Sequence, residues 1–170
     1  MLLTLRSLFW AIVLPGTITV YIPSLILRGT EPPDPWGVMQ WLALLVGVLG
    51  SVILVHCIVA FAVVGGGTLS PADAPRHLVV RGLYRYVRNP MYFGVCLILL
   101  AEGAFFDSAA MLEYSGVSMI GVHMFVVLYE EPRLREEFGE SYERYCRAVH
   151  RWRPGRPYDP LLEDMSKGLS

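Results

Sequence analysis

The chain has 170 residues, of which 54% are hydrophobic and only 17% are charged, and its formal net charge at pH 7 is −1. Soluble domains usually carry about 25% charged residues, so this composition argues against an ordinary soluble domain. We expect a single membrane domain over residues 1–170, with no nucleic-acid partner.

Four apolar stretches reach, or nearly reach, the roughly 20 residues that a helix needs to cross a bilayer. The first should be kinked by Pro15 and Pro23. It is longer than the apolar core of a signal peptide and lacks a cleavage site, so we interpret it as a retained span. A short turn between the last two stretches predicts an antiparallel helical hairpin. The stretches cover about residues 8–27, 36–64, 91–106 and 109–129.

The basic residues in the loops predict the orientation of these spans. The loop after the second stretch holds four arginines, and the segment after the fourth holds seven arginines and one lysine, whereas the turn between the third and fourth holds neither. Because basic loops stay in the cytosol, we expect cytosolic segments at 65–90 and 130–170 and both termini on the cytosolic side. The two segments can therefore build one site together.

The first candidate site is Arg88-Asn89-Pro90. Asparagine favours the N-cap and proline the first position of a helix, so the third span should begin here. The unpaired N–H groups of that first turn, beside Arg88, could bind a carboxylate or phosphate. The alternative is a capped membrane helix whose arginine reaches the interface.

The second candidate is the pair Glu130-Glu131, which precedes Pro132. We expect the two carboxylates to close the fourth span, where the helix dipole disfavours negative charge. Local exceptions of this kind often mark functional sites, and the pair suits an ammonium, a sulfonium or ribose hydroxyls. The alternative is that Arg133 or Arg135 neutralises them and they only end the helix.

His123 precedes Glu130 by seven residues, so the two should share one helical face. We interpret His123, like His56 and Glu102, as a residue that hydrogen-bonds a neighbour or a head group. Farther on, apolar residues recur at spacings of three and four from Leu134 to Val149. They predict an amphipathic helix, broken at Gly139, that either covers a ligand or rests on the membrane.

Other motifs are absent from the sequence. The three cysteines have no C-x-x-C spacing and are expected to be free thiols rather than metal ligands or disulfides. Gly65-Gly66-Gly67 has no preceding strand, so it is not a nucleotide loop. We find no nucleophile elbow and no metalloprotease motif, and we expect no metal site.

The run from Arg76 to Gly94, with Gly82-Leu-Tyr84, Arg88-Asn-Pro-Met-Tyr92 and Gly94, resembles the hallmark of isoprenylcysteine carboxyl methyltransferase-like enzymes. The run from Glu130 to Tyr145 resembles the second motif of that family, and membrane phospholipid methyltransferases carry a similar glutamate pair. The resemblance covers about half of the chain, residues 71–157. It implies an all-α membrane fold in which about four spans and a C-terminal amphipathic helix enclose the cofactor.

The cofactor that this resemblance implies is S-adenosylmethionine, bound without a Rossmann fold, and the substrate is lipid-soluble. The residues implied to contact the cofactor are Arg76, His77, Leu78, Val79, Tyr84, Asn89, Pro90, Met91, Tyr92, Glu130 and Glu131. The helix start at Asn89 could take the methionyl carboxylate, the glutamates the ammonium, and Tyr84 or Tyr92 could pack on the adenine or the sulfonium.

The sequence departs from the family pattern at two places, and the first of them leaves the acceptor open. The end of the fourth span, Met124–Tyr129, lacks the arginine that holds a prenylcysteine carboxylate, and Asn89 replaces the usual histidine. A phospholipid amine, an isoprenoid or another lipid remains as acceptor. The alternatives are an NADPH-dependent membrane reductase and a non-enzymatic four-helix transporter or scaffold.

Overall fold

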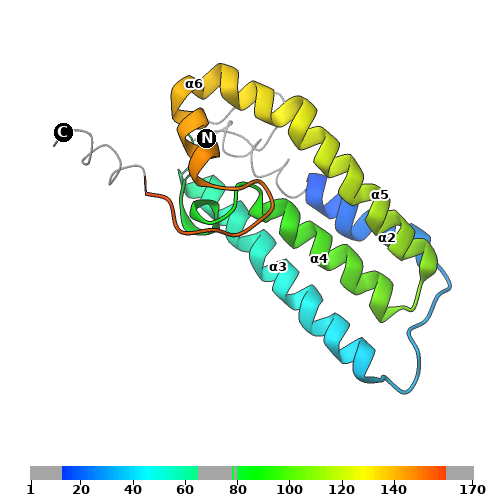
Figure 1. Cartoon of the computed structure of the whole chain (residues 1–170). Coiled ribbons are helices and arrows are strands. Elements are labelled where there is room, and N and C mark those ends of the chain that lie inside the picture. Colours follow the sequence, from blue (N-terminus) through cyan, green and yellow to red (C-terminus); the bar gives the residue numbers. More distant parts are fainter. Residues whose placement is uncertain (1–12, 65–77, 79, 160–170) are drawn as a thin grey trace.

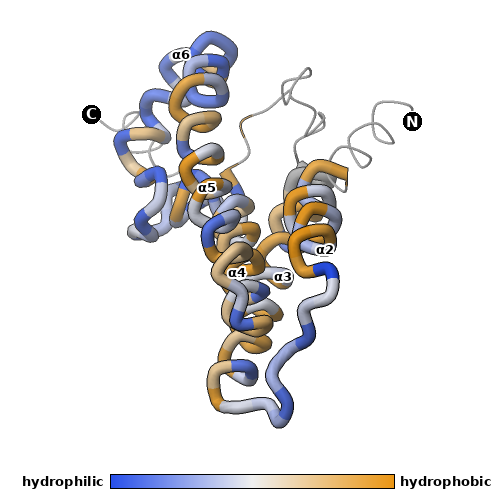
Figure 2. The backbone as a smooth tube through the Cα atoms, turned by 90° about the vertical axis from the view of Figure 1, so that its right-hand side faces the viewer, coloured by the Kyte–Doolittle hydropathy of each residue, from blue (hydrophilic) through white to orange (hydrophobic). Residues whose placement is uncertain are grey.

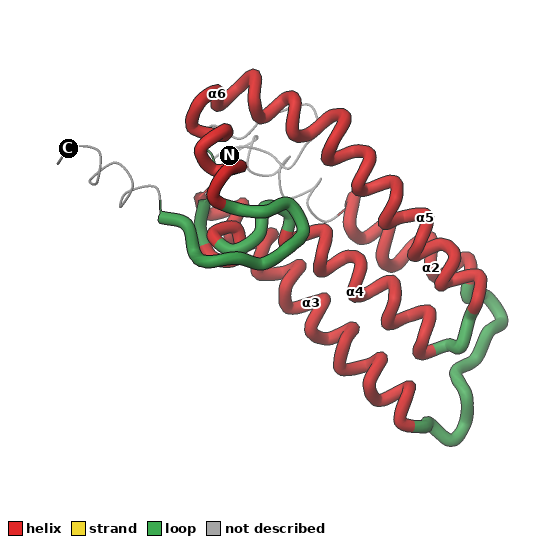
Figure 3. Tube along the Cα trace, in the orientation of Figure 1, coloured by secondary structure: helices red, strands yellow, loops and turns green. Residues whose placement is uncertain are grey.

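The computed structural model describes residues 13–64, 78 and 80–159, and the regular elements within these ranges are all helical (Figures 1 and 3). After a first helical turn that starts at Val13, the elements are η1 (Thr17–Tyr21), α2 (Ile22–Ile26), α3 (Val38–Val64), η2 (Gly82–Arg85), α4 (Pro90–Phe105), α5 (Ala109–Phe125), η3 (Val126–Glu130) and α6 (Glu131–Ala148).

The first apolar stretch is helical from Val13 to Ile26, and the beginning of the predicted span lies outside the described residues. Between its two prolines the helix widens into the π-helical turn η1, where the N–H of Ile22 donates to the carbonyl of Thr17. A π turn accommodates the ring and the missing N–H of Pro23 without ending the helix.

Helix α4 lies at the centre of the bundle, between α3 and α5 (Figure 1). It approaches α3 closely because glycines face each other at the crossing. A Cβ atom on Gly94 would lie 2.8 Å from the carbonyl oxygen of Gly50, and a Cβ atom on Gly50 would lie 2.8 Å from that of Gly94. Small residues allow such backbone contact between helices.

Helices α4 and α5 form the predicted antiparallel hairpin. Asp107 adopts a positive φ of 50° directly after α4, which is the conformation that commonly ends a helix. Ser108 then caps α5, since its hydroxyl accepts a hydrogen bond from the N–H of Met111. Three residues therefore reverse the direction of the chain. The predicted starts of the third and fourth apolar stretches, at residues 91 and 109, lie within one residue of the starts of α4 and α5.

The prediction that the helix of the fourth apolar stretch ends at Glu130 and Glu131 is wrong, because the helix continues through them. Helix α5, η3 and α6 follow one another without an intervening loop over Ala109–Ala148. The π-helical turn η3 ends where the N–H of Glu131 donates to the carbonyl of Val126, so Pro132 is again preceded by a widened turn. The predicted break at Gly139 is confirmed, with φ 50° and ψ −126°.

By length and composition, two described helices could cross a membrane, where the sequence predicted about four. These are the helices over Val38–Ala60 and Ala109–Ala148, whereas Val13–Ile26 and Pro90–Phe105 are apolar but shorter. In the most apolar part of each of these two helices, most residues are exposed, whereas a helix in the core of a soluble protein is mostly buried. Figure 2 shows the apolar bundle and, at one end, the hydrophilic α6.

Candidate functional site

The described parts of the two charged segments meet at one end of the bundle. The chain after α6, residues 149–159, runs across this end, and we call it the C-terminal strap. Backbone N–H groups of Arg88, Gly155 and Tyr158 donate to the carbonyls of His150, Tyr86 and Arg85 at 3.0, 2.9 and 2.9 Å. The strap thus pairs with the chain between η2 and α4.

The second half of α6 packs against the chain before η2 and is joined to η2 by a hydrogen bond. Tyr142, Tyr145 and Val149 are buried together, with Leu78 packed against them. The hydroxyl of Tyr145 donates to the carbonyl of Tyr84 at 2.6 Å. The kink at Gly139 turns this part of α6 back toward the bundle end (Figure 1), so the amphipathic face covers the site.

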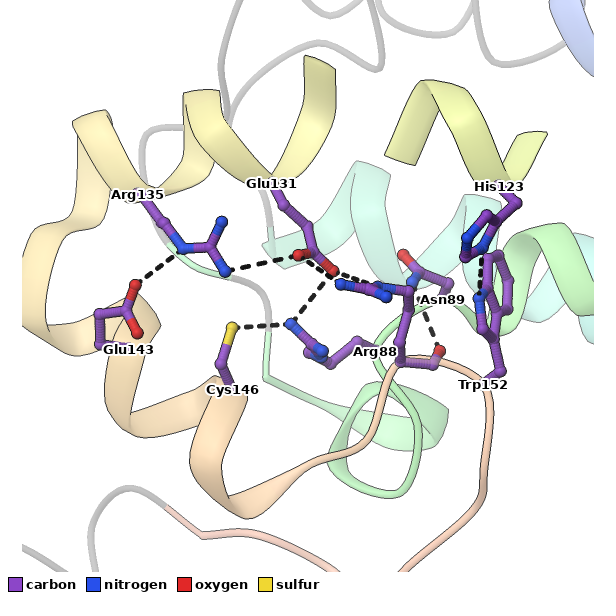
Figure 4. Close-up of polar contacts among 9 residues, drawn as sticks. Arg88, Asn89, His123, Glu131, Arg135, Glu143, Cys146 and Trp152 are labelled. Atoms are coloured by element: carbon purple, nitrogen blue, oxygen red, sulfur yellow. Dashed lines mark hydrogen bonds and ion pairs between the residues drawn. The ribbon is translucent and has the colours of Figure 1, made fainter. Parts of the chain in front are cut away.

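Glu131 lies at the centre of an ion cluster with three arginines (Figure 4). It is only 2% exposed. Arg151 of the strap binds both of its carboxylate oxygens, from Nε at 2.6 Å and from Nη2 at 2.9 Å. Arg88 lies 3.2 Å from Oε1 and Arg135 lies 3.5 Å from Oε2. A bidentate arginine–carboxylate pair is strong and fixes its geometry.

The environment of Glu131 keeps its carboxylate ionised. Burial acts to raise the pKa of Glu131, but hydrogen bonds from Arg151 and the charges of Arg88, Arg151 and Arg135 outweigh it and hold the pKa below its ordinary value. Glu131 therefore ties the strap to α6 and to the loop before α4.

Glu130 has a different partner, on α4. The hydroxyl of Tyr92 donates to Oε2 of Glu130 at 2.9 Å. Tyr84 lies near both groups, and its pKa is raised well above the usual value by burial, with further contributions from Cys57, Glu130 and Tyr92 among others. The phenol of Tyr84 is therefore neutral at physiological pH. The Tyr92–Glu130 bond therefore joins the end of the motif over 76–94 to the beginning of the motif over 130–145.

Asn89 starts α4 as predicted, but its side chain does not cap the helix. Its Nδ2 donates instead to the carbonyl of Arg151 at 3.3 Å. Asn89 thus holds the strap, and the N–H groups in the first turn of α4 are not capped by this side chain. Such N–H groups, at the positive end of the helix dipole, can bind an anion.

The predicted site residues fall into three groups. Arg76, His77 and Val79 lie outside the described residues. Tyr92 bonds Glu130 and Tyr84 lies near both, Met91 packs against the cluster of Cys57 and Tyr84, and Asn89 and Pro90 are buried at the start of α4. Leu78 packs under α6, and Glu131 faces the arginines.

The seven-residue spacing of His123 and Glu130 does not place them on one face, because η3 adds one residue to the turn between them. Glu131, and not Glu130, therefore shares a helical face with His123. Consecutive residues of the strap then contact this face, since Arg151 binds Glu131 and Nε1 of Trp152 donates to Nδ1 of His123 at 3.1 Å (Figure 4).

Sequence reasoning did not identify Arg151 or Trp152 as parts of this site. Eight basic residues follow the fourth apolar stretch, and nothing in their spacing singles out the one that meets Glu131. The third unforeseen member is Cys146, whose Sγ accepts a hydrogen bond from Nη1 of Arg88 at 2.7 Å.

Comparison with protein-family models matches residues 38–141, more than half of the chain, to the family described as phospholipid methyltransferase. The matched range extends from the start of α3 into the second half of α6. It therefore contains Tyr84, Asn89, Tyr92, Glu130 and Glu131. A search of curated proteins found no match.

Proposed function

The chain belongs to the phospholipid methyltransferase family, and from this membership we propose that it transfers a methyl group from S-adenosylmethionine to a lipid-soluble acceptor. Membership implies a methyltransferase that acts on lipids. The cofactor, the residues that hold it and the location of the reaction at the cytosolic face of a membrane are our proposal.

The observation that carries the proposal is the bond between Tyr92 and Glu130. It joins the start of α4 to the end of η3, so a carboxylate lies beside the first turn of a helix. A carboxylate and a helix N-terminus together match a ligand that carries both an ammonium and a carboxylate. The residues present therefore fit the amino-acid part of S-adenosylmethionine.

In this proposal Glu130 binds the ammonium and the N–H groups of Met91 and Tyr92 bind the carboxylate. The aromatic rings of Tyr84 and Tyr92 offer surfaces for the adenine or the sulfonium. We reassign Glu131 from cofactor contact to positioning, because three arginines surround it. Its role is to hold the strap over Asn89 and thereby to exclude water.

When bound, S-adenosylmethionine supplies a methyl group on a sulfonium, which the lone pair of an acceptor displaces in line. Such a displacement depends on positioning more than on an acid or a base. Tyr92 orients the carboxylate of Glu130, and the ion cluster fixes the position of α6 relative to α4. An amine acceptor would lose its proton to water or buffer.

We further propose that the four apolar stretches all span the membrane, with the strap and α6 on the cytosolic side. The positive charges of the loops support this orientation. The soluble cofactor would then enter from the cytosol and the acceptor from the lipid.

The test is calorimetric binding of S-adenosylmethionine and of NADPH to the purified protein in detergent. We expect S-adenosylmethionine to bind and Glu130→Gln to weaken it by roughly tenfold to one hundredfold, since a hydrogen bond to a charged group contributes about 1.5–3 kcal/mol. Glu137→Gln, at an exposed residue of α6, is the matched control and should bind normally.

Two outcomes would contradict the proposal. Binding of NADPH without S-adenosylmethionine would identify a reductase. Binding of neither ligand would remove the cofactor assignment and favour a scaffold.

A further inference from the structure

A second polar pair, His123 and Trp152, lies beside the proposed cofactor site. His123 precedes Glu131 by eight residues on the same helical run, which places it roughly 10–12 Å along the helix toward its apolar part. Its ring centroid lies 6.1 Å from that of Trp152. In Figure 4 the pair lies apart from the ion cluster, on the far side of Asn89.

The strap runs from the start of α4 toward α5, and Trp152 lies where it reaches α5. The carbonyl of Arg151, directly before Trp152, accepts the hydrogen bond from Asn89 on one side, and the indole reaches His123 on the other. Trp152 therefore bridges the two helical runs that provide Tyr92 and Glu130.

The hydrogen bond fixes which nitrogen of His123 can donate. An indole N–H is a donor only, so Nδ1 of His123 must accept and carry no proton. The proton of the neutral ring is then on Nε2, and no hydrogen bond from Nε2 to another described residue is formed. His123 is exposed, and its neighbours Ile120 and Met124 are exposed apolar residues. The pair presents an N–H donor and a flat aromatic face at an apolar surface.

We infer that His123 and Trp152 contact the methyl acceptor on the lipid side of the site, with Nε2–H of His123 donating to an oxygen of the lipid head group. This inference rests on the proposed function and adds to it the residues that recognise the acceptor. It also explains why no cation is needed in Met124–Tyr129: the donor comes from a neutral histidine whose tautomer the strap sets.

Substitutions can separate the two nitrogens of His123. The amide oxygen of asparagine lies about where Nδ1 lies and can still accept from Trp152, but no donor remains near Nε2. The amide nitrogen of glutamine lies about where Nε2 lies and can donate. Trp152→Phe keeps an aromatic ring and removes the N–H. Trp41→Phe, on the exposed surface of α3, is the matched control.

The probe is phosphatidylethanolamine in mixed micelles, with kcat and the KM for lipid measured separately from the calorimetric Kd for S-adenosylmethionine. We expect His123→Asn and Trp152→Phe to raise the lipid KM roughly fivefold to tenfold, the effect of one hydrogen bond. His123→Gln should restore part of this loss, and the Kd for S-adenosylmethionine should change less than about twofold. An unchanged lipid KM, or a Kd that rises in parallel, would overturn the inference.

A second measurement does not require turnover or a working cofactor site. Brominated phosphatidylethanolamine quenches tryptophans that it touches, and the contribution of Trp152, one of four tryptophans, is the difference between the native chain and Trp152→Phe. We expect this contribution to be quenched and His123→Asn to weaken the quenching. If Trp152 is not quenched, the pair does not contact lipid and the inference fails, whether or not S-adenosylmethionine binds.

Discussion

Glu130 and Glu131 are adjacent in sequence but face different surroundings. Successive residues of a helix point about 100° apart, so one carboxylate reaches Tyr92 on α4 and the other reaches arginines from the strap and from the loop before α4. Two adjacent identical side chains therefore have different partners: Glu130 is the residue that we propose binds the cofactor, and Glu131 holds the strap.

Glu131→Gln should destabilise the protein more than any other loss of a single carboxylate in α6. The substitution leaves Arg88, which is largely buried, without its counter-charge. We expect a loss of about 2 kcal/mol, below the roughly 3–5 kcal/mol for a fully buried pair, because Arg151 and Arg135 reach solvent. Thermal unfolding in detergent measures the change. Glu143→Gln, which breaks only an exposed pair with Arg135, should cost under about 1 kcal/mol.

The contribution of Glu131 should also depend on pH. The pKa of Glu131 is lower in the folded chain than in the unfolded one, so its contribution is present above the unfolded value, about 4.3, and is lost as the pH falls through the folded value. The stability difference between the native chain and Glu131→Gln should be full near pH 7 and shrink below about pH 4. A difference that stays constant into this acidic range would contradict the ion cluster.

At the scale of elements, the contact between α3 and α4 depends on the absence of side chains. In Gly94→Ala the new Cβ atom would meet the backbone of Gly50 at 2.8 Å and that of Leu54 at 3.0 Å, so the helices must separate. We expect a loss of roughly 1–3 kcal/mol. Gly116→Ala in α5 is the control, since no atom lies within 4 Å of its Cβ position. It should be neutral or stabilising by up to about 1 kcal/mol.

The boundaries of most elements could be predicted from the sequence because they have local causes. Pro90 starts α4, and the break at Gly139 follows from its missing side chain. The two π-helical turns could not be predicted in this way. Pro15 and Pro23 predicted a kink, and the glutamate pair before Pro132 predicted a helix end. A widened turn also accommodates a proline, and whether one forms depends on what packs around it.

At the scale of the whole molecule, the sequence predicted that the two charged segments lie together at one end of the bundle, but not which of their residues contact each other. The motifs around Asn89 and Glu130 could be identified because they are contiguous. The contacts of Arg151 and Trp152 join residues 20 and 29 positions apart, and they follow from the path of the strap, which no local pattern encodes.

The proposed orientation predicts that the turn between α4 and α5 and the bend of α6 lie on opposite sides of the membrane. Single-cysteine variants at the exposed Asp107 and Glu140, in a chain without its native cysteines, can be labelled with an impermeant maleimide. In sealed vesicles of one orientation, only one of the two positions should react before the membrane is opened. Labelling of both positions would exclude the four-span arrangement.

The strap comes after its hydrogen-bond partners in the sequence, and this order affects how the site forms during synthesis. Asn89, His123 and Glu131, the described residues that hydrogen-bond to Arg151 and Trp152, are all synthesised before them. A nascent chain can thus insert and pack its apolar helices while the polar end of the bundle is still open. The strap can close the site only after residues 151 and 152 have been made, so a chain interrupted before residue 151 would have the helices of the protein but not its closed site.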